Sequence, residues 1–420
     1  MRTVHEAALD PLRSGSGARG GGGRAEAVRF AATHTLPVLV RGFVSGGARG
    51  QGTHPCAAPA RPRWSAAALR ALRERHGSAP VQVRGPAGTA LLLLDPQDLR
   101  RFHTEPSGEP RGARRWIHDE VLAAEAPVHP SCGPFLAAVA AEAPLLTAAG
   151  SLELTRARHT VARIGRRIVL GDAAAGDEEL TSLLGQLRGG RARNARTVRT
   201  LHDKAVARIR QYAAQAAPHT LVGRAARHGD PVGPAQDWLA AMDAVPATLL
   251  RTLLLLGAHP AEQDAAAAEA GGGACDARAE LPRLRACVRE SLRLFPVVPD
   301  LVRVTRTETE WQGERHPPGT TLLAPAAFHQ RDPEHVPAAH VFVPGRWKAP
   351  ASDHDMRMAP FGHGAGRCPG SRLGLLLTSA LCAEVLRGHR VESARPVLNP
   401  TGPLPMTLDP QGIRLLLGHR

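Results

Sequence analysis

One stretch near the carboxyl end of the chain constrains the local fold more than any other. Residues 360–374 read PFGHGAGRCPGSRLG, which places one cysteine among five glycines and two prolines, and an apolar run, LGLLLTSALCAEVL, begins within it. Pro369 suits the first turn of a helix, where its missing N–H is not needed. The pattern predicts a turn poor in side chains that presents Cys368 at the amino end of a helix. There the helix dipole and unpaired backbone N–H groups stabilise a thiolate.

Cys368 has other interpretations when the residues are considered alone. A lone cysteine in a glycine-rich turn is often a buried structural residue. The letters HGAG are similar to the oxyanion loop of some serine hydrolases, but the GxSxG nucleophile motif of those enzymes occurs nowhere in the chain. A phosphate-binding loop would need a preceding strand and a lysine, and the stretch has neither.

The order of patterns along the chain indicates a mainly helical protein with a small β region. Residues 1–60 contain SGSGARGGGG and SGGARGQG, which predict a flexible segment. Residues 65–77 have a helical pattern, and VQVRGPAGTALLLLD predicts two short strands around a Gly/Pro turn. Apolar residues recur at helical spacing over much of 111–270, and Pro, Gly and His interrupt the chain after about residue 300. We therefore expect one domain over 61–420.

Charge and cysteine content exclude several classes of protein. The formal net charge is +15, but lysine occurs only at Lys204 and Lys348, and only fourteen of the 420 residues are aromatic. Because few aromatic rings are available to stack on bases, we expect no nucleic-acid partner. The six cysteines form no CxxC pair, so neither a disulfide framework nor a zinc module is predicted. With no continuous apolar segment of spanning length, we expect a cytoplasmic protein without a membrane span.

A second pattern lies in RACVRESLRLFP. Glu290 and Arg293 are three residues apart, which places their side chains on one face of a helix that ends before Pro296. Such a pair is most often a surface ion pair of little energetic value. The apolar neighbours Leu292 and Leu294 favour a buried pair instead.

Together, four patterns in a fixed order resemble the cytochrome P450 family of haem-thiolate oxygenases. That family carries an ExxR helix, a segment similar to HRDP, a segment similar to FxPERW, and FxxGxRxCxG around the cysteine that binds the haem iron. Here the corresponding residues are Glu290 with Arg293, HQRDP at 329–333, FVPGRW at 342–347 and FGHGAGRCPG at 361–370. The resemblance covers residues 235–390 and extends more loosely to about residue 80. It implies the cytochrome P450 fold, a large helical domain with a minor β-sheet domain around buried haem b.

The resemblance also implies a role for individual residues. Cys368 would be the proximal iron ligand, flanked in the motif by Phe361 and Gly370, and its thiolate would donate electron density to the iron. Arg303 and the weaker candidate Trp116 would contact the haem propionates. The structural network that supports the cysteine loop would be formed by Glu290, Arg293 and Arg346.

Two departures from the family pattern concern the haem edge. The arginine or histidine usually found two residues before the cysteine is Gly366 here, so one propionate partner is missing at that position. We expect His363 or Arg367 to replace it. The FVPGRW segment has glycine where the family often has glutamate, and it keeps Arg346.

The largest departure is in the helix expected to cross the haem. The acid and alcohol usual there fall on Asp243 and Ala244, so the acid is present and the hydroxyl is not. Pro246 would leave the carbonyl of Met242 without its helical donor. A positioned acid can deliver protons to the site, and we predict a catalytic role for Asp243. The alternative is a solvated surface carboxylate.

The function that the resemblance implies is hydroxylation or another oxidation of an apolar small molecule, such as a secondary metabolite. Electrons would come from a ferredoxin or a flavoprotein reductase, and an arginine-rich surface suits an acidic donor. Loss of the hydroxyl favours two alternatives that need no such relay, a peroxygenase or an isomerase. A haem-binding accessory protein that has lost catalysis is a third alternative.

Overall fold

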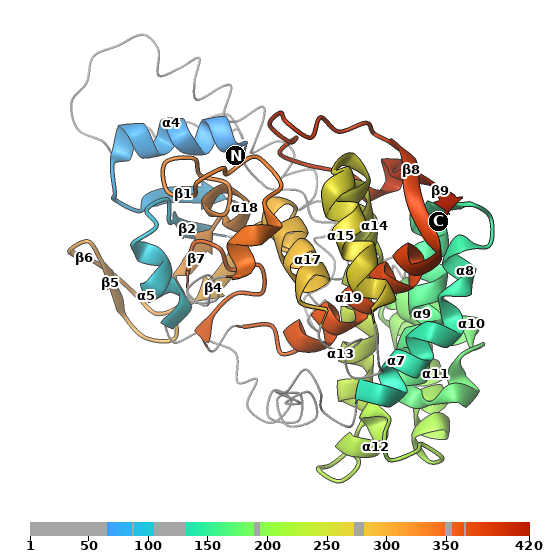
Figure 1. The fold of residues 1–420 in the computed structure, drawn as a ribbon. Helices are drawn as coiled ribbons and strands as arrows, with labels where there is room; N and C mark the ends of the chain where they lie inside the picture. The colour runs from blue at the N-terminus through green and yellow to red at the C-terminus, as the bar shows by residue number, and fades with distance from the viewer. Residues whose placement is uncertain are drawn as a thin grey trace.

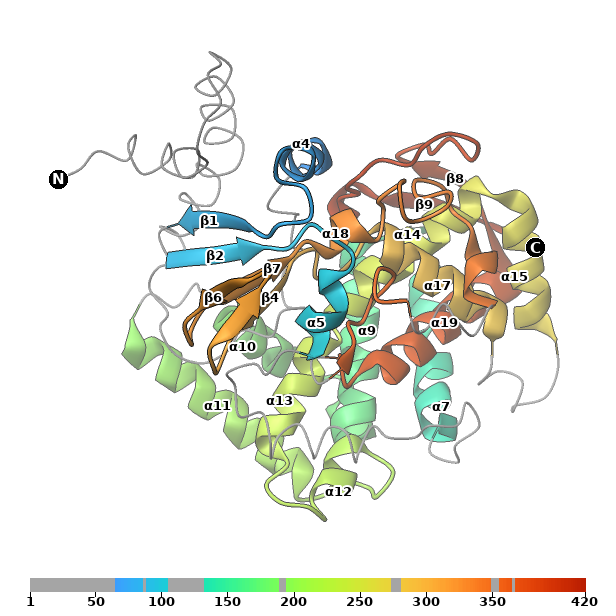
Figure 2. The ribbon, with the colours of Figure 1, turned by 90° about the vertical axis from the view of Figure 1, so that its left-hand side faces the viewer.

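The structure, a computed structural model, describes residues 65–85, 88–104, 132–188, 194–272, 281–348, 355–364 and 367–420. Figures 1 and 2 show a sheet with short helices around it on one side of the molecule and the long helices on the other. The expected flexible segment 1–60 lies outside the described residues. The expected single domain over 61–420 stays a prediction.

The sheet combines strands from two distant parts of the chain, residues 81–92 and residues 301–324. Its strand order is β1-β2-β7-β4; β1 and β2 are antiparallel, β2 and β7 are parallel, and β7 and β4 are antiparallel. The register pairs Leu91 with Leu322, and Val302 with Leu323. The elements of this region are α4 (Ala66–His76), β1 (Val81–Gly85), β2 (Gly88–Leu92), α5 (Asp98–Thr104), β4 (Leu301–Val304), β7 (Thr321–Ala324) and α18 (Ala326–His329). The predicted helix at 65–77 and the two predicted strands are confirmed.

Both faces of this sheet are covered, because its apolar residues alternate in direction along each strand. On one face Leu92 and Leu323 pack with Leu69 of α4. On the other face Leu91 and Leu322 pack with residues of α5. The sheet thereby fixes α5, which carries a histidine of the site described below.

The helical region follows β2 in the chain, and its last long helix before residue 300 leads to β4 of the sheet. Its first part contains α7 (Cys132–Glu142), α8 (Pro144–Thr147), β3 (Ser151–Glu153), α9 (Leu154–Leu170), the 3-10 helix η3 (Asp172–Ala174), α10 (Glu178–Arg188), α11 (Ala195–Ala213) and α12 (Leu221–Ala225). Its second part contains α13 (Val232–Ala241), α14 (Ala244–Ala258), α15 (Pro260–Gly271), α17 (Pro282–Leu294), η4 (Pro344–Lys348) and α19 (Ser371–Gly388). The mainly helical fold class is confirmed, although β3 interrupts the helical pattern of residues 144–171.

The core of the molecule lies around α14. Leu249, Leu250 and Leu253 to Leu256 are at most 1 % exposed, and α14 packs against α9, α15, α17 and α19. A helix with this many apolar side chains must be enclosed by others. The central position of α14 explains why the four helices named here meet at one place.

The segment formed by α13 and α14 concerns the expectation that the chain has no membrane span. Val232–Ala258 is long and apolar enough to cross a membrane by length and composition, but 72 % of its most apolar stretch is buried inside the protein. A buried core helix has the same length and composition as a spanning helix. The sequence analysis missed this segment because Asp237, Asp243 and Arg251 interrupt its apolar runs.

Two smaller β structures complete the described chain. A three-stranded sheet of order β3-β9-β8 brings residues near position 150 against the carboxyl end, and β5 and β6 form a hairpin. Their bounds are β5 (Thr309–Trp311), β6 (Glu314–His316), β8 (His389–Arg395), η7 (Pro410–Gly412) and β9 (Arg414–His419).

Candidate functional site

The pair predicted on α17 is completely enclosed. Glu290 and Arg293 each have 0 % side-chain exposure, and two hydrogen bonds join them: Arg293 Nε donates to Glu290 Oε2 at 2.9 Å and Arg293 Nη2 donates to Oε1 at 2.8 Å. A buried pair of this kind needs further partners to offset the loss of water.

Arg293 finds its further partners in the segment that leads to the cysteine. Its Nη1 donates to the carbonyl oxygens of Gln330 and Ala339, both at 2.8 Å, and its Nη2 donates to that of Val341 at 3.1 Å. One guanidinium therefore holds three backbone carbonyls of an otherwise irregular segment against α17.

Glu290 is satisfied from η4. It accepts hydrogen bonds from the Val343 N–H at 3.0 Å, from Arg346 Nε at 3.2 Å and from Trp347 Nε1 at 2.9 Å. The structure thus brings Glu290, Arg293 and Arg346 together. Trp347 was not among the predicted members, although it adjoins Arg346 in the FVPGRW segment.

Cys368 lies in the loop before α19. Its N–H donates to the Phe361 carbonyl at 2.8 Å, and its carbonyl accepts from the Ser371 N–H at 3.2 Å, at the start of the helix. The Phe361 ring packs against Val288 and Leu292 of α17 and Leu375 of α19. The loop is therefore held by its own backbone and by an apolar anchor on the helix that carries the network.

Exposure distinguishes Cys368 from the other described cysteines. Cys287 and Cys382 are fully buried, whereas Cys368 is partly exposed. Burial raises the pKa of Cys287 to about 12 and also raises the pKa of Cys382, so both thiols stay protonated. Of Cys287, Cys368 and Cys382, Cys368 alone combines access with a position at a helix start.

Glycine at residue 364 is required by its surroundings. Its φ is +58°, and a Cβ there would lie 2.6 Å from the carbonyl oxygen of His103. The loop therefore lies directly on α5. Gly370 is less constrained: a Cβ there would be 3.9 Å from Cys368 Sγ, so glycine keeps that side of the sulfur bare. The adjoining Gly366 lies outside the described residues.

His103 of α5 is a site residue that the sequence analysis missed. Its ring lies 5.3 Å from the ring of His363, edge to face, and its Nδ1 accepts the His363 N–H at 3.4 Å. Arg303 of β4 is 8 % exposed and lies over the ring of Phe102, beside His103. The sequence has no signal for this grouping, because positions 103, 303 and 363 belong to three separated segments.

The electrostatics of this corner favour an anion. Burial, together with the nearby His363, Arg303 and His329, lowers the pKa of His103 to about 4. His103 is thus a neutral imidazole, and because Nδ1 accepts a hydrogen bond, Nε2 carries the proton. A carboxylate entering here would meet an N–H donor beside a guanidinium.

Asp243 lies at the junction of α13 and α14. Its carboxylate is 3.1 Å from Arg188 Nη2 of α10, and 39 % of its side chain is exposed. Burial of the remainder raises the pKa of Asp243, and Arg188 and Arg158 oppose that shift. Within the described residues its carboxylate has no hydrogen bond or ion pair with the Cys368 loop, so its catalytic role stays a prediction.

One expectation at this junction is wrong. The Met242 carbonyl was expected to lack a donor, but it accepts the Val245 N–H at 3.1 Å. The chain makes a tighter turn there, since the Asp243 N–H also bonds three residues back, to Ala240 at 3.2 Å. The turn divides the expected single helix into α13 and α14.

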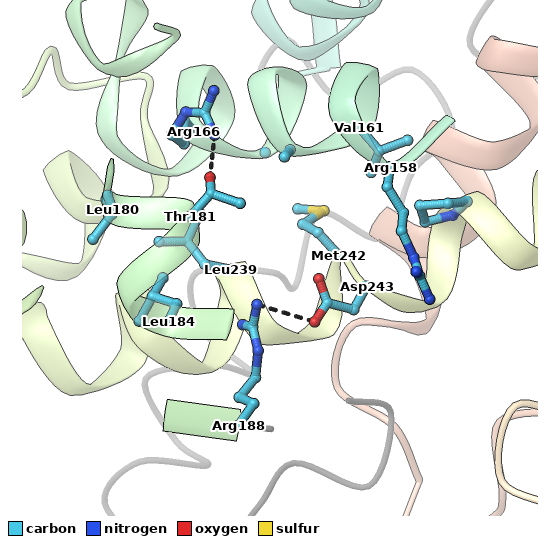
Figure 3. Close-up of a pocket in the computed structure, with 13 residues that line it drawn as sticks. Arg158, Val161, Arg166, Leu180, Thr181, Leu184, Arg188, Leu239, Met242 and Asp243 are labelled. Atoms are coloured by element: carbon cyan, nitrogen blue, oxygen red, sulfur yellow. Dashed lines mark hydrogen bonds and ion pairs between the residues drawn. The ribbon is translucent and has the colours of Figure 1, made fainter. Parts of the chain in front are cut away.

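The same junction opens onto a cavity of about 130 Å³ between α9, α10 and α13–α14. Figure 3 shows Asp243 facing Arg188 across this space, with Arg158 on its other side. Of the predicted site residues, this cavity includes Asp243 and none of the Cys368 loop. The predicted contact of Trp116 falls on a residue outside those the structure describes.

Comparisons with known proteins show which family and which fold the chain is similar to. Residues 238–417 match the model of the family described as cytochrome P450. A zebrafish cytochrome P450 solved with abiraterone superposes with a TM-score of 0.64 at 18 % identity, over 84 % of this chain and 99 % of that one. This likeness shows the fold.

Curated relatives match shorter parts of the chain. "Sterol 14alpha-demethylase" of Mycobacterium tuberculosis is 34 % identical over 120 residues, which is 28 % of this chain and 27 % of that protein. "Cyclooctat-9-en-7-ol 5-monooxygenase" of Streptomyces melanosporofaciens is 32 % identical over 215 residues, 46 % of each. "Thromboxane-A synthase" of Mus musculus is 34 % identical over 144 residues, 34 % of this chain and 25 % of that protein. These alignments span less than half the length of each relative.

Proposed function

We propose that this chain is a member of the cytochrome P450 family, whose cofactor is haem b, and that it is a haem-thiolate monooxygenase with Cys368 as the iron ligand. The observation that carries the proposal is the placement of Cys368. It is a partly exposed thiol at the start of α19, held by the Phe361 carbonyl and anchored through Phe361 on α17.

The residues around Cys368 fit haem on two further grounds. The imidazole and guanidinium groups of His103, His363 and Arg303 converge beside the loop, where the acidic edge of a porphyrin needs partners. The bare side of Gly370 leaves room next to the sulfur. When bound, haem supplies the redox chemistry that activates dioxygen.

The protein contributes position and charge to this chemistry. Glu290, Arg293 and Arg346 hold the segment that leads to the loop, so that the sulfur keeps one place. Arg303 and His363 would pair with the propionates of the haem. His103 would donate a hydrogen bond from Nε2 to one of them and so replace the side chain that glycine lacks at position 366. Trp116 remains a proposed propionate partner.

The substrate we propose is an apolar small molecule, with a secondary metabolite as the specific case. Support comes from the relatives, whose names refer to a sterol and to cyclooctat-9-en-7-ol. We also propose a cytoplasmic protein without a nucleic-acid partner.

The electron donor we propose is an acidic ferredoxin or flavoprotein that docks on the cysteine side. Arg367 is exposed next to Cys368, Arg372 is partly exposed at the start of α19, and Lys348 is exposed at the end of η4. Reversal of these three charges should slow reduction by the donor and leave haem content unchanged. An unchanged reduction rate would refute the docking surface.

The test of the main proposal is the spectrum of the reduced protein with carbon monoxide. Thiolate ligation gives a strongly red-shifted Soret band, which should disappear in Cys368→Ala. Cys382→Ala is the matched control, because this buried thiol should have no effect on the band. A spectrum typical of histidine-ligated haem in the wild type would overturn the assignment.

His103 has its own test, which does not depend on turnover. Removal of a hydrogen bond to a charged group should speed transfer of haem from His103→Ala to apomyoglobin by about tenfold. His335→Ala is the control, because the His335 ring is paired with Asp332, and this variant should transfer haem at the wild-type rate. Equal rates in all three proteins would remove His103 from the site.

A second function, oxidation by peroxide or isomerisation without a reductant, is favoured by the state of the α13–α14 junction. Ala244 has no hydroxyl, Asp243 is paired with Arg188, and the hydroxyl of Thr248 donates to the Ala244 carbonyl at 2.9 Å. Turnover with hydrogen peroxide or an endoperoxide in the absence of any reductase would support this function. Turnover only with the reductase would reject it.

A further inference from the structure

The cavity between α9, α10 and the α13–α14 junction has apolar walls and a charged rim. Gly165 of α9 lets Met242 approach, since a Cβ there would lie 3.1 Å from Met242 Cγ. The other apolar side chains that line it are Val161, Ala162, Leu180, Leu184, Leu239 and Pro246. The space therefore favours the body of a hydrophobic ligand.

Arginines dominate the polar groups of the cavity. Arg166 is already satisfied, because it donates to the carbonyls of Ala174 and Ala175 and to the hydroxyl of Thr181. Arg158 and Arg188 remain, and both act on the carboxylate of Asp243. In Figure 3 that carboxylate lies between the two arginine side chains.

The charges at the rim do not balance. Arg158 and Arg188 carry two positive charges and Asp243 carries one negative charge, so the rim keeps one positive charge in excess. Arg188 is only 18 % exposed, and burial lowers its pKa, so its charge is poorly solvated. A second carboxylate placed at the rim would relieve this cost and form a charge-assisted hydrogen bond.

We propose that this cavity binds a small apolar carboxylic acid, with its body between α9 and α10 and its carboxylate on Arg188 and Arg158. The volume of about 130 Å³ sets the size of the ligand. An apolar cavity of about 150 Å³ accepts benzene, so benzoate is the probe of matching size. The bound carboxylate competes with Asp243 for Arg188.

Competition between the two carboxylates predicts opposite changes in benzoate affinity for two variants, which a purely apolar pocket would not produce. Removing an arginine must weaken binding of benzoate, and removing the carboxylate of Asp243 must strengthen it. Binding is measured by calorimetry on the full-length holoprotein, and because it needs no turnover, it stands or fails independently of the proposed monooxygenase activity.

The experiment compares benzoate with toluene as the uncharged probe. Arg188→Gln should weaken benzoate binding by about tenfold or more, since the variant cannot form the charge-assisted hydrogen bond. Asp243→Asn should tighten it several-fold. Arg199→Gln, on the exposed side of α11, is the matched control and should bind benzoate as the wild type does.

A cavity-filling variant tests the location. Ala162→Leu adds volume to the wall without changing charge, and it should abolish binding of benzoate while the protein keeps its cooperative unfolding transition. Equal affinity for toluene and benzoate, or no effect of either Arg188→Gln or Asp243→Asn, would overturn the proposal. So would the absence of benzoate binding to the wild type at millimolar concentration.

Discussion

Two ion pairs of the same chemical type occupy opposite situations in this protein. Glu290 and Arg293 are both 0 % exposed, and both side chains bond to further partners, which lie within residues 330–347. Asp243 and Arg188 are 39 % and 18 % exposed, meet through one contact at 3.1 Å, and border a cavity.

The difference in burial separates a structural role for the first pair from a ligand-binding role that we propose for the second. The enclosed pair is a fixed junction between α17 and the chain that leads to Cys368, and it has no capacity left for a ligand. The open pair is joined by one contact, and Arg158 beside it leaves one positive charge in excess at the rim of the cavity. We therefore propose that Arg188 can exchange Asp243 for the carboxylate of a ligand.

The largest effect is expected at the enclosed pair. Glu290→Ala leaves Arg293 buried without its carboxylate and should lower the free energy of unfolding by about 3–5 kcal/mol. Urea denaturation measures it. Glu308→Ala is the control, since Glu308 is 62 % exposed and 3.8 Å from Arg315, and it should cost less than about 0.5 kcal/mol. Similar losses in both variants would erase the distinction between enclosed and open pairs.

A single donor to the enclosed pair can be removed with little change of shape. Trp347→Phe removes the N–H that bonds to Glu290 Oε2 and should cost about 1.5–3 kcal/mol by urea denaturation, beyond the loss of ring volume. Trp311→Phe is the matched control, because Trp311 is 1 % exposed and its Nε1 has no hydrogen-bond partner among the described residues. If both variants lose the same stability, the hydrogen bond to Glu290 contributes nothing.

The loop that the enclosed pair supports gives the next effect. Gly364→Ala places a Cβ 2.6 Å from the His103 carbonyl oxygen at a φ of +58°, and should cost about 1–3 kcal/mol and loosen haem binding. Thermal unfolding and haem transfer together measure both. Gly345→Ala has no atom within 4 Å of the added carbon and should behave as the wild type. An unaffected Gly364→Ala protein would mean that the loop does not rest on α5.

The smallest effect, with the opposite sign, is expected at the open pair. Burial raises the pKa of Asp243, so between its unfolded and folded pKa the native state binds more protons, and stability falls as pH rises through that window. Asp243→Asn should therefore be slightly more stable than the wild type at neutral pH, by less than about 1 kcal/mol. At about pH 4 the difference should shrink. A variant that is less stable at neutral pH would show that Arg188 outweighs burial.

Sequence reasoning was most successful where chemistry is local in the chain. Glu290 and Arg293 share a helix face at a fixed spacing, so their pairing could be anticipated, and the family resemblance of FVPGRW implied that Arg346 joins them. Trp347 was overlooked because nothing in its neighbours indicates an indole directed at a carboxylate. His103 could not be predicted, since its partners are more than 190 positions away.

The α13–α14 junction is a second place where the sequence did not reveal the contacts. Pro246 correctly indicated a disturbed helix, but it did not indicate that the Val245 N–H would satisfy the Met242 carbonyl. Nor did it indicate that Asp243 would meet Arg188, because that contact depends on how α10 packs across the junction.

The order of amino acids was enough to indicate the mainly helical fold class, the Glu290–Arg293 pair and the family resemblance, because these depend on periodicity and on short motifs. The place of Arg346 in the network was implied by that resemblance. The grouping of His103, Arg303 and His363, and the arginine-rimmed cavity beside Asp243, exist because separate elements pack together. The side chains that meet there are set by the burial of apolar surface elsewhere, in the sheet and around α14, and no local pattern records that outcome.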